Sequence, residues 1–404
     1  MSTQLHRIPT FLGLQRSTMG LLLMVILVGL GERMAERFLP IYLIALGGSA
    51  ITVGLLNAMD NLLSALYSFS GGYLSDRLGT KGALLVFNIV AIFGFLIVIF
   101  MPSWQAVLVG AVFFLSWSAI SLPATMSLIS QVLPKNKQTM GVSMHSLVRR
   151  IPMALGPILG GLCIAAWGET SGVRIAFVFA LILAIAAIAL QQKLIEEVKP
   201  NATSDECQLS PEKNPFKLLS LMNPSLKRLL FSDILVRFCE QIPYAFVVIW
   251  CMKIIEQPVT AIQFGLLTSI EMATALLVYI PVAYLADKST KKPFVVITFV
   301  FFTLFPLVLI YCSSFEWLVL AFMLRGLKEF GEPTRKALIM DLAPDDCKAG
   351  MFGLYYLIRD VFVSIAAFGG AFLWQISPET NFFIAFLFGV AGTFGFILMG
   401  KDFT

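Results

Sequence analysis

Apolar runs long enough to cross a membrane recur at nearly even spacing along this chain. A membrane-spanning helix needs roughly 20 consecutive apolar residues. The runs therefore predict twelve membrane helices, six on each side of a polar stretch over residues 192–223. We place the helices at Thr18–Leu46, Ile51–Leu74, Ala83–Met101, Trp104–Leu133, Gly141–Trp167, Val173–Gln191, Pro224–Met252, Thr260–Leu285, Phe294–Cys312, Trp317–Leu342, Lys348–Ile376 and Asn381–Leu398.

This spacing predicts an all-α integral membrane protein built from two bundles of six helices. The predicted parts are an N-terminal bundle over 1–191, a cytoplasmic linker over 192–223 and a C-terminal bundle over 224–404. Composition agrees, because 58% of the residues are hydrophobic and only 13% are charged, against about 25% charged in soluble domains. The first apolar run is long and carries no small-residue cleavage site, so we expect it to be a retained helix.

The basic residues of the short loops predict the orientation, since cytoplasmic loops are enriched in Lys and Arg. Arg174 and Lys253 are nearly the only basic residues in the loops assigned to the outside. We therefore expect both termini in the cytoplasm and the chain in a bacterial inner membrane. The basic residues on the predicted inner side are Arg7, Arg16, Arg77, Lys81, Lys135, Lys137, Lys193, Lys199, Lys213, Lys217, Lys288, Lys291, Lys292, Lys348 and Lys401.

The two halves align with each other. Tyr73–Arg77 matches Tyr284–Lys288 at an offset of about 211, and at that offset Gly54 and Asp60 fall on Gly265 and Glu271. Pro123, Pro134 and Arg149 fall on Pro333, Pro344 and Arg359 at an offset of about 210. Arg33-x-x-Glu36 resembles Arg237-x-x-Glu240 at a shifted offset. Internal repeats of this kind are typical of transporters, with the binding site between the repeats near the middle of the bilayer.

The loop between the second and third predicted helices reads Gly71-Gly72-Tyr73-Leu74-Ser75-Asp76-Arg77-Leu78-Gly79-Thr80-Lys81. It resembles the signature G-x-L-x-D-R-x-G-R-K of the major facilitator superfamily, with departures at Tyr73 and Thr80. In that family the loop is thought to latch the two halves in one state, so the resemblance implies a conformational latch. The residues assigned to it are Gly72, Asp76, Arg77, Gly79, Lys81 and, in the degraded second copy, Asp287.

The fifth predicted helix carries Gly156-Pro157-Ile158-Leu159-Gly160-Gly161. This is similar to the end of the family's antiporter motif, although its earlier glycines are missing. Small residues also let helices approach closely, so ordinary helix packing is the alternative interpretation of Gly156, Pro157, Gly160 and Gly161. The motif favours export without deciding it.

Many charged residues fall inside the predicted spans. Each costs at least about 2.5–3.5 kcal/mol at the bilayer centre, so these residues are expected to face a cavity or one another. They fall on helices 1, 2, 5, 7, 8, 10 and 11, which line or flank the cavity in the superfamily's fold. On helix 10 they form a stripe that we expect to pair along one helix, with Arg325, Arg335 and Lys336 near enough to a membrane face to reach it.

Two interpretations of these charges stay open, namely ion pairs that rigidify the protein and groups that bind substrate or carry protons. For proton coupling we select Glu36, Asp60 and Glu240. For substrate contact we select Arg33, Arg37, Arg149, Arg237, Glu329 and Arg359.

The predicted function is secondary active transport of a small organic solute by alternating access, driven by the proton gradient and directed outward. Proton-coupled uptake of an organic anion, amino acid or similar metabolite is the alternative, and a receptor or lipid-handling protein on the same fold is an alternative of another class. No nucleotide-binding loop of the G-x-x-x-x-G-K-[ST] kind is present, and the six cysteines are scattered singly. We therefore expect no enzymatic activity, cofactor, metal or nucleic-acid partner, and a monomer whose partners are its solute and membrane lipid.

Overall fold

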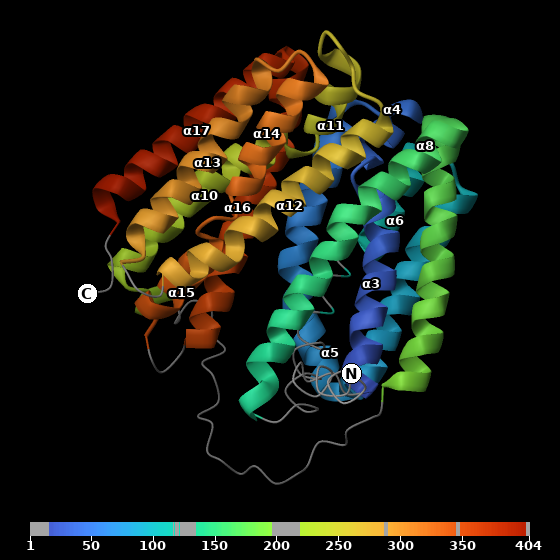
Figure 1. Cartoon of the computed structure of the whole chain (residues 1–404), viewed down its shortest axis with the longest axis horizontal. Helices are drawn as coiled ribbons and strands as arrows, with labels where there is room; N and C mark the ends of the chain where they lie inside the picture. Colours follow the sequence, from blue (N-terminus) through green and yellow to red (C-terminus); the bar gives the residue numbers. More distant parts are fainter. Residues whose placement is uncertain are drawn as a thin grey trace, which may run out of the picture. The chain divides into compact units, whose positions relative to one another are not determined.

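A computed structural model describes residues 16–115, 117, 121, 135–195, 219–286, 290–344 and 348–400, and every regular element in these ranges is helical (Figure 1). The first half contains α3 (Arg16–Glu36), α4 (Leu39–Ala45), α5 (Ala50–Phe100), α6 (Trp104–Phe114) and α8 (Lys135–Leu194). The second half contains α10 (Pro224–Tyr244), α11 (Val247–Ile249), the π-helix η1 (Trp250–Ile254), α12 (Ala261–Ala286), α13 (Lys292–Ile310), α14 (Phe315–Leu327), α15 (Glu332–Leu342), α16 (Lys348–Ile376) and α17 (Pro378–Met399).

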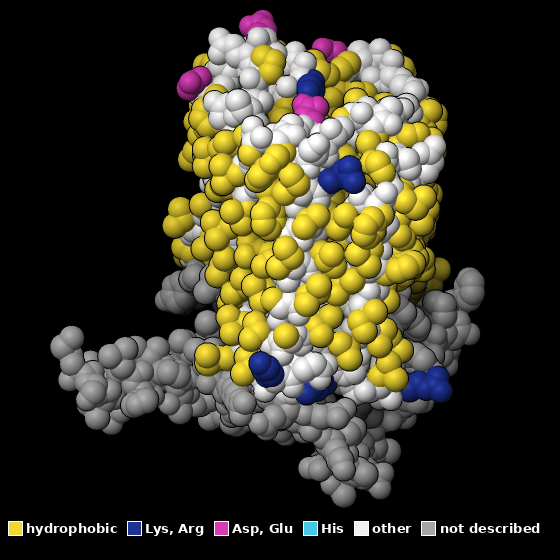
Figure 2. Space-filling model, turned by 90° about the vertical axis from the view of Figure 1, so that its right-hand side faces the viewer, with side chains coloured by type: hydrophobic (Ala, Val, Ile, Leu, Met, Phe, Trp, Pro, Cys, Tyr) yellow, Lys and Arg dark blue, Asp and Glu magenta, His cyan; other side chains and the backbone are white. Residues whose placement is uncertain are grey.

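Within these ranges six helices are long and apolar enough to cross a membrane, and a bent pair adds a seventh. The bent pair joins Pro224–Tyr244 to Val247–Ile254 at 42°. The molecular face in Figure 2 is covered by hydrophobic side chains, and most of its few charged groups lie toward its two ends. Exposed apolar side chains such as Phe93 and Ile185 cost nothing against lipid, which confirms an all-α integral membrane protein.

Two predicted helix boundaries coincide with turns at glycine. Gly79 and Gly168 have φ of +74° and +80°, a conformation that favours glycine because it has no Cβ. Gly79 interrupts α5 between the second and third predicted helices, and Gly168 interrupts α8 between the fifth and sixth.

Three helices predicted as continuous are broken, and that part of the prediction was wrong. The first ends at Glu36 and resumes at Leu39, the seventh ends at Tyr244, and the tenth is split between Leu327 and Glu332. A proline lies at each break, namely Pro40, Pro243 and Pro333. Proline has no N–H to donate to the carbonyl four residues earlier, so it favours a helix end there.

The chain folds into two compact units. Unit 1 comprises Met1–Gly48, Leu63–Ser204 and Thr260–Leu266, and unit 2 comprises Ser49–Leu62, Asp205–Val259 and Leu267–Thr404. In unit 1, α3 packs along α8, and in unit 2, α10 packs against α13, α16 and α17. The predicted division at residues 192–223 follows the sequence alone and stays a prediction.

Glycines mark equivalent close approaches in the two units. A Cβ on Gly160 would lie 2.0 Å from the carbonyl oxygen of Met34, and a Cβ on Gly370 would lie 2.3 Å from that of Ile242. Gly160 and Gly370 are separated by 210 residues, which is the offset of the sequence repeat. The repeat is therefore also one of helix packing, since only glycine fits at either crossing.

The aligned glycines Gly54 and Gly265 show the same equivalence. A Cβ on Gly265 would lie 2.6 Å from the carbonyl oxygen of Pro157 within unit 1. A Cβ on Gly54 would lie 3.3 Å from the carbonyl oxygen of Phe368 and 2.5 Å from Cβ of Ala371 within unit 2. Each glycine lets its helix approach the backbone of the neighbouring helix.

Candidate functional site: a buried ion network

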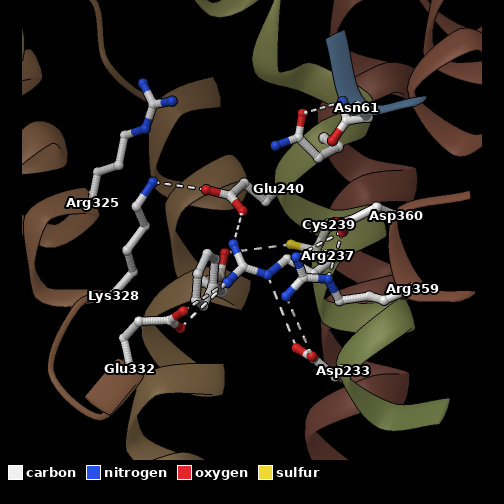
Figure 3. A network of polar contacts seen from close by, with 12 residues as sticks. Asn61, Asp233, Arg237, Cys239, Glu240, Arg325, Lys328, Glu332, Arg359 and Asp360 are labelled. Carbon is white, nitrogen blue, oxygen red and sulfur yellow. Dashed lines mark hydrogen bonds and ion pairs between the residues drawn. The ribbon is translucent and has the colours of Figure 1, made fainter. Parts of the chain in front are cut away.

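Unit 2 encloses a continuous network of charged side chains from α10, α12, α14, α15 and α16. Figure 3 shows part of this network. Among the described residues, and apart from Lys336, whose side chain is half exposed, five carboxylates lie within 4.0 Å of five basic groups. The acids are Asp233, Glu240, Glu271, Glu332 and Asp360, and the bases are Arg237, Arg325, Lys328, Arg335 and Arg359. Because a lone buried charge is very costly, their numerical balance is what makes this burial tolerable.

Asp233 is the centre of one half of this network and is fully buried. Arg335 Nη1 donates to its Oδ1, and Tyr355 Oη donates to its Oδ2 at 2.9 Å. Arg335 also donates to Glu332 Oε1 at 2.6 Å. The guanidinium of Arg335 is 1% exposed, so its two carboxylates replace the water it has lost.

Glu240 is the centre of the other half. Its Oε2 lies 2.5 Å from Arg237 Nη1, and its Oε1 lies 2.8 Å from Lys328 Nζ. Lys328 Nζ also lies 3.4 Å from Glu271 Oε1, which Arg325 Nε approaches to 3.3 Å. One lysine is therefore shared between two carboxylates, and a small movement of its ammonium would change the partner it favours.

Aromatic rings surround the basic groups of this half. The guanidinium carbon of Arg325 lies 5.0–5.6 Å from the ring centroids of Tyr244, Phe305 and Phe322. Lys328 Nζ lies 5.7 Å from the centroid of Phe302. The ring faces attract these cations and exclude water from them. A small pocket opens beside them, lined by Glu240, Val247, Phe301, Phe302, Phe305, Arg325 and Lys328.

Side-chain amides satisfy the carbonyls at the end of α10. Asn57 Nδ2 donates to the carbonyl of Gln241 at 2.8 Å, and Asn61 Nδ2 lies 3.3 Å from Gln241 Oε1. Asn381 Nδ2 donates to the carbonyls of Ile242 at 3.4 Å and Gly370 at 2.7 Å. The last carbonyls of a helix have no partner within it, so these amides stabilise the bend that follows Tyr244.

Unit 1 contains the counterpart of the Arg237–Glu240 pair. Arg33 Nη1 lies 2.7 Å from Glu36, and both side chains are largely buried. A Cβ on Gly156 would lie 2.6 Å from Arg33 Cβ, so α8 passes directly over the pair. Arg149, about two turns before Gly156 on α8, lies within electrostatic range of Glu32 and Arg33.

The structure thus brings several selected residues together within each unit. Arg33 and Glu36 form a pair with Arg149 nearby in unit 1, whereas Arg237, Glu240 and Arg359 belong to the network of unit 2. The other three selected residues lie elsewhere in the two units. Arg37 follows α3 in unit 1. In unit 2, Asp60 lies on α5 and Glu329 lies between α14 and α15. Their roles, like those of the others, stay predictions.

The helix 10 stripe differs from its prediction. Arg325 and Arg335 are 4% and 1% exposed, so neither reaches a membrane face. Arg325 forms an ion pair with Glu271 of α12, and Lys328 forms ion pairs with Glu240 of α10 and Glu271. Arg335 pairs with Glu332 along its own helix, as expected, and also with Asp233 of α10. Lys336, with a side chain 51% exposed, contacts Glu332 one turn away as expected.

Asp233, Glu271, Lys328, Glu332 and Arg335 fall inside the predicted spans, but none of them was selected for the site. Their burial was detectable from their apolar surroundings. Their partners were not, because each ion pair joins helices far apart in the sequence, such as Asp233 with Arg335.

The proposed latch is described only in part. Gly79 makes the turn, and Arg77 is exposed. Lys81 Nζ donates to the carbonyl of Gln192 at 3.0 Å, and Gln191 Nε2 donates to the carbonyl of Lys81 at 2.8 Å. Gly72 and Asp76 lie in α5 where side chains are not described, and Asp287 lies outside the described residues.

The four residues of the antiporter-like motif are all at close helix contacts. Gly156 and Gly160 adjoin Arg33 and Met34 of α3. Pro157 and Gly161 adjoin the start of α12, where a Cβ on Gly161 would lie 2.5 Å from the carbonyl oxygen of Ala261. This geometry is what the packing interpretation requires. Among the described residues no cluster of His, Cys, Asp or Glu has metal-binding geometry.

Comparisons with known proteins agree with this architecture. The uncharacterized MFS-type transporter MJ1317 of Methanocaldococcus jannaschii is 25% identical over 369 residues, which cover 87% of each chain. The quinolone resistance protein NorA of Staphylococcus aureus is 27% identical over 188 residues, covering 46% of this chain and 47% of NorA.

Solved transporter structures share the fold at low sequence identity. A nucleoside transporter NupG structure superimposes with a TM-score of 0.78 at 15% identity, covering 95% of this chain and 100% of its own. A POT family transporter in complex with a thioalcohol-conjugated peptide has a TM-score of 0.75 at 14% identity, covering 93% and 95%. Residues 21–255 and 229–402 each match the Major Facilitator Superfamily, so the chain belongs to that family of membrane transporters.

Proposed function

We propose that this protein exports a small organic solute in exchange for protons, by alternating access between the two sides of a bacterial inner membrane. The observation that carries the proposal is the buried network of five acids and five bases in unit 2. Ionisable groups at membrane depth are expensive and are typically retained for ion or substrate pathways. The similarity to NorA and the partial antiporter motif support the outward direction.

In this proposal Glu36, Asp60 and Glu240 carry the coupling protons. Glu240 illustrates the chemistry, because two cations hold its carboxylate within 2.8 Å. Protonation of Glu240 would remove its attraction for Arg237 and Lys328 together. Both cations would then favour other carboxylates, either Glu332 and Glu271 or an acidic group of the solute. Proton binding and rearrangement of the site would thereby be linked.

The excess of basic groups in unit 1 would attract an anion, so we propose that the solute is acidic or zwitterionic. Residues 32–37 and 149–150 contain two glutamates and four arginines, Arg33, Arg37, Arg149 and Arg150. The solute is proposed to contact the first three of these arginines, together with Arg237, Glu329 and Arg359 of unit 2. The excess of arginine also favours the second candidate, proton-coupled uptake of an organic anion or amino acid.

The remaining assignments belong to the same proposal. Both termini lie in the cytoplasm, and the protein acts as a monomer in contact with lipid. It is not an enzyme and uses neither nucleotide, metal nor organic cofactor, because the proton gradient supplies the free energy. Gly72, Asp76, Arg77, Gly79, Lys81 and Asp287 form the latch.

Proteoliposomes with an imposed pH gradient test the proposal. A transported solute should move protons across the membrane, inward for each solute exported, and the sign of coupling separates export from uptake. Glu36→Gln, Asp60→Asn and Glu240→Gln are each expected to reduce gradient-driven transport. Solute exchange without a gradient serves as the control for binding and folding. Undiminished gradient-driven transport in all three variants would show that the protons bind elsewhere.

The latch has a separate test. Asp76→Asn is expected to slow transport, because the loop would hold one state less well, while the amount of protein in the membrane stays unchanged. Thr80→Ser, in the same loop, is the control. Equal transport rates in the two variants would argue against a latch at Asp76.

A further inference from the structure

The small pocket of unit 2 is lined by two basic groups, one acid and four apolar side chains. The charged members are Arg325, Lys328 and Glu240, and the apolar side chains supply no hydrogen-bond acceptor. The cavity volume is about 10 Å³, close to the smallest space that holds one water molecule. The pocket therefore has room for a water molecule or a monatomic ion but not for an organic solute.

Arg325 brings hydrogen-bond donors without an acceptor to this pocket. The residue is 4% exposed, and its Nε lies 3.3 Å from Glu271 Oε1. Among the described residues, no acceptor lies within hydrogen-bond distance of its terminal nitrogens, Nη1 and Nη2. These two nitrogens carry four of the five N–H groups of a guanidinium. An anion beside them would satisfy a cation that is otherwise surrounded by the rings of Tyr244, Phe305 and Phe322.

Lys328 is the second cation of the pocket and shares an acid with Arg325. Its Nζ lies 2.8 Å from Glu240 Oε1 and 3.4 Å from Glu271 Oε1, the oxygen that Arg325 also approaches. Figure 3 shows Lys328 directed at Glu240, whereas Arg325 contacts none of the residues drawn. Two cations are thus balanced by two carboxylates, and Glu240 is needed for that balance.

A neutral Glu240 would leave a surplus of positive charge in unit 2. Among the described residues, the buried network would then contain five bases and four ionised acids, and Arg325 and Lys328 would share Glu271. A buried charge without a counterion is very costly. A monovalent anion in the pocket would restore the balance directly beside Arg325 and Lys328.

Charge and size together select a halide as this anion. A cation would face Arg325 and Lys328, and a water molecule would leave the surplus charge uncompensated. A carboxylate or phosphate exceeds the volume of the pocket. Chloride is monatomic, accepts hydrogen bonds from N–H groups and is abundant in the solutions that surround a cell membrane.

We propose that the pocket binds one chloride ion beside Arg325 and Lys328 when Glu240 is neutral. The ion replaces the charge that Glu240 loses, and ionised Glu240 disfavours the ion by repulsion. The inference adds an inorganic anion to the proposed exchange of solute and protons. It rests on that proposal only for the role of Glu240 as a proton carrier.

Thermal unfolding of the purified full-length protein tests this site at neutral pH, with sodium chloride replacing sodium methanesulfonate at constant ionic strength. Glu240→Gln imitates the protonated acid and is expected to bind chloride at least about fivefold more tightly than the unmodified protein, as for two coupled sites. Glu379→Gln, the same change at an exposed position of unit 2, should leave chloride binding unchanged. The dependence of stabilisation on chloride concentration gives the dissociation constants.

Further changes distinguish the pocket from other anion sites. Val247→Ile adds a methyl group to the lining and should abolish the stabilisation of Glu240→Gln by chloride. Val248→Ile, the same change at the adjacent buried valine outside the lining, should preserve it. Arg325→Lys keeps the charge but removes Nη1 and Nη2, and should also abolish it.

Two results would overturn the proposal. One is a Glu240→Gln protein that chloride stabilises no more than methanesulfonate does. The other is chloride stabilisation that survives both Val247→Ile and Arg325→Lys. If Glu240→Gln is too unstable to purify, the monomeric fraction of detergent-solubilised membranes in each salt provides the same comparison, and chloride should increase that fraction.

These results are separable from those of the transport tests. If Glu240→Gln binds chloride tightly while its gradient-driven transport is undiminished, the chloride site stands and Glu240 is not a proton carrier. If Glu240→Gln loses gradient-driven transport and shows no stabilisation specific to chloride, coupling through Glu240 stands and the chloride site falls.

Discussion

The same Arg-x-x-Glu sequence occurs once in each unit, and the two copies have nearly the same local geometry. Arg33 and Glu36 lie 2.7 Å apart, and Arg237 and Glu240 lie 2.5 Å apart. Their surroundings differ. Glu240 has Lys328 as a second cation, and Arg237 has Glu332 as a second acid. The three-residue spacing within one helix therefore brings the arginine and the glutamate together. The neighbouring helices determine how many further charged partners hold the two side chains in place.

This difference shows that the two units share their helix packing more closely than the charges around the Arg–Glu pair. Gly160 and Gly370 bring equivalent helices together in both units. Among the described residues, unit 2 surrounds its pair with charges of both signs from α12, α14, α15 and α16. Residues 32–37 and 149–150 of unit 1 are rich in arginine. Balanced charge favours rigidity and proton exchange, and excess positive charge favours an anionic ligand.

The largest effect is expected from removing the centre of the unit 2 network. Asp233→Ala would leave Arg335, 1% exposed, without its shortest ion pair. Breaking a buried pair in this way costs about 3–5 kcal/mol. Thermal unfolding of the purified protein should show a large decrease in stability. Lys336→Ala, which removes a half-exposed charge, is the control; similar losses in both variants would contradict a central role for Asp233.

The glycine crossings test whether the packing is equivalent in the two units. Gly160→Ala and Gly370→Ala would each place a methyl group within 2.3 Å of a carbonyl oxygen. Overpacking of this kind typically costs about 1–3 kcal/mol, and equal losses of stability are expected. Gly353→Ala, where a Cβ meets no atom within 4 Å, should be neutral or slightly stabilising. A loss in only one of the two variants would show that the units differ in packing as well as charge.

The two Arg–Glu pairs are compared directly by neutralising each acid. Glu240→Gln removes the acceptor of two cations, and we expect a loss of about 1–3 kcal/mol. Glu36→Gln is expected to cost less, because Glu36 contacts Arg33 alone among the described side chains. Thermal unfolding of both variants measures the difference. Equal costs would mean that the surrounding network of unit 2 adds no stability to its pair.

The smallest effect is expected outside the buried network. Lys291 and Asp341 form an ion pair whose side chains are 26% and 35% exposed. Lys291→Ala should cost at most about 1 kcal/mol, and the cost should diminish at 1 M salt, since salt screens exposed charges. The effect of Asp233→Ala should not change with salt. Matching salt dependence in the two variants would indicate that water and ions reach Asp233.

The sequence predicted those features of the structure that depend on residues close together in the chain. The apolar runs predicted the helices, and glycine at positions 79 and 168 coincides with the turns between them. The spacing of Arg237 and Glu240 placed both on one side of a helix, where they meet. The offset between the halves predicted which glycines are equivalent, and Gly54 and Gly265 occupy equivalent packing positions.

The sequence could not predict what depends on the choice of neighbouring helix. Helix 10 appeared as one continuous stripe, and its residues were expected to pair with each other. Arg335 and Lys336 do contact Glu332 of their own helix. Beside the break at Lys328–Gly331, however, Lys328 also meets Glu240 of α10, and Arg335 meets Asp233 of α10. Such pairs depend on the rotation of each helix about its axis, which hydrophobic periodicity determines only coarsely.

The bond from Asn57 to the carbonyl of Gln241 has a consequence for dividing the gene. Asn57 precedes the middle of the chain, yet its partner and its compact unit lie mainly in the second half. A fragment beginning at Asp205 would lack this amide and the segment Ser49–Leu62 with it. Two half-length fragments should therefore accumulate in the membrane only when they are synthesised in the same cell, where each supplies a segment that completes the other.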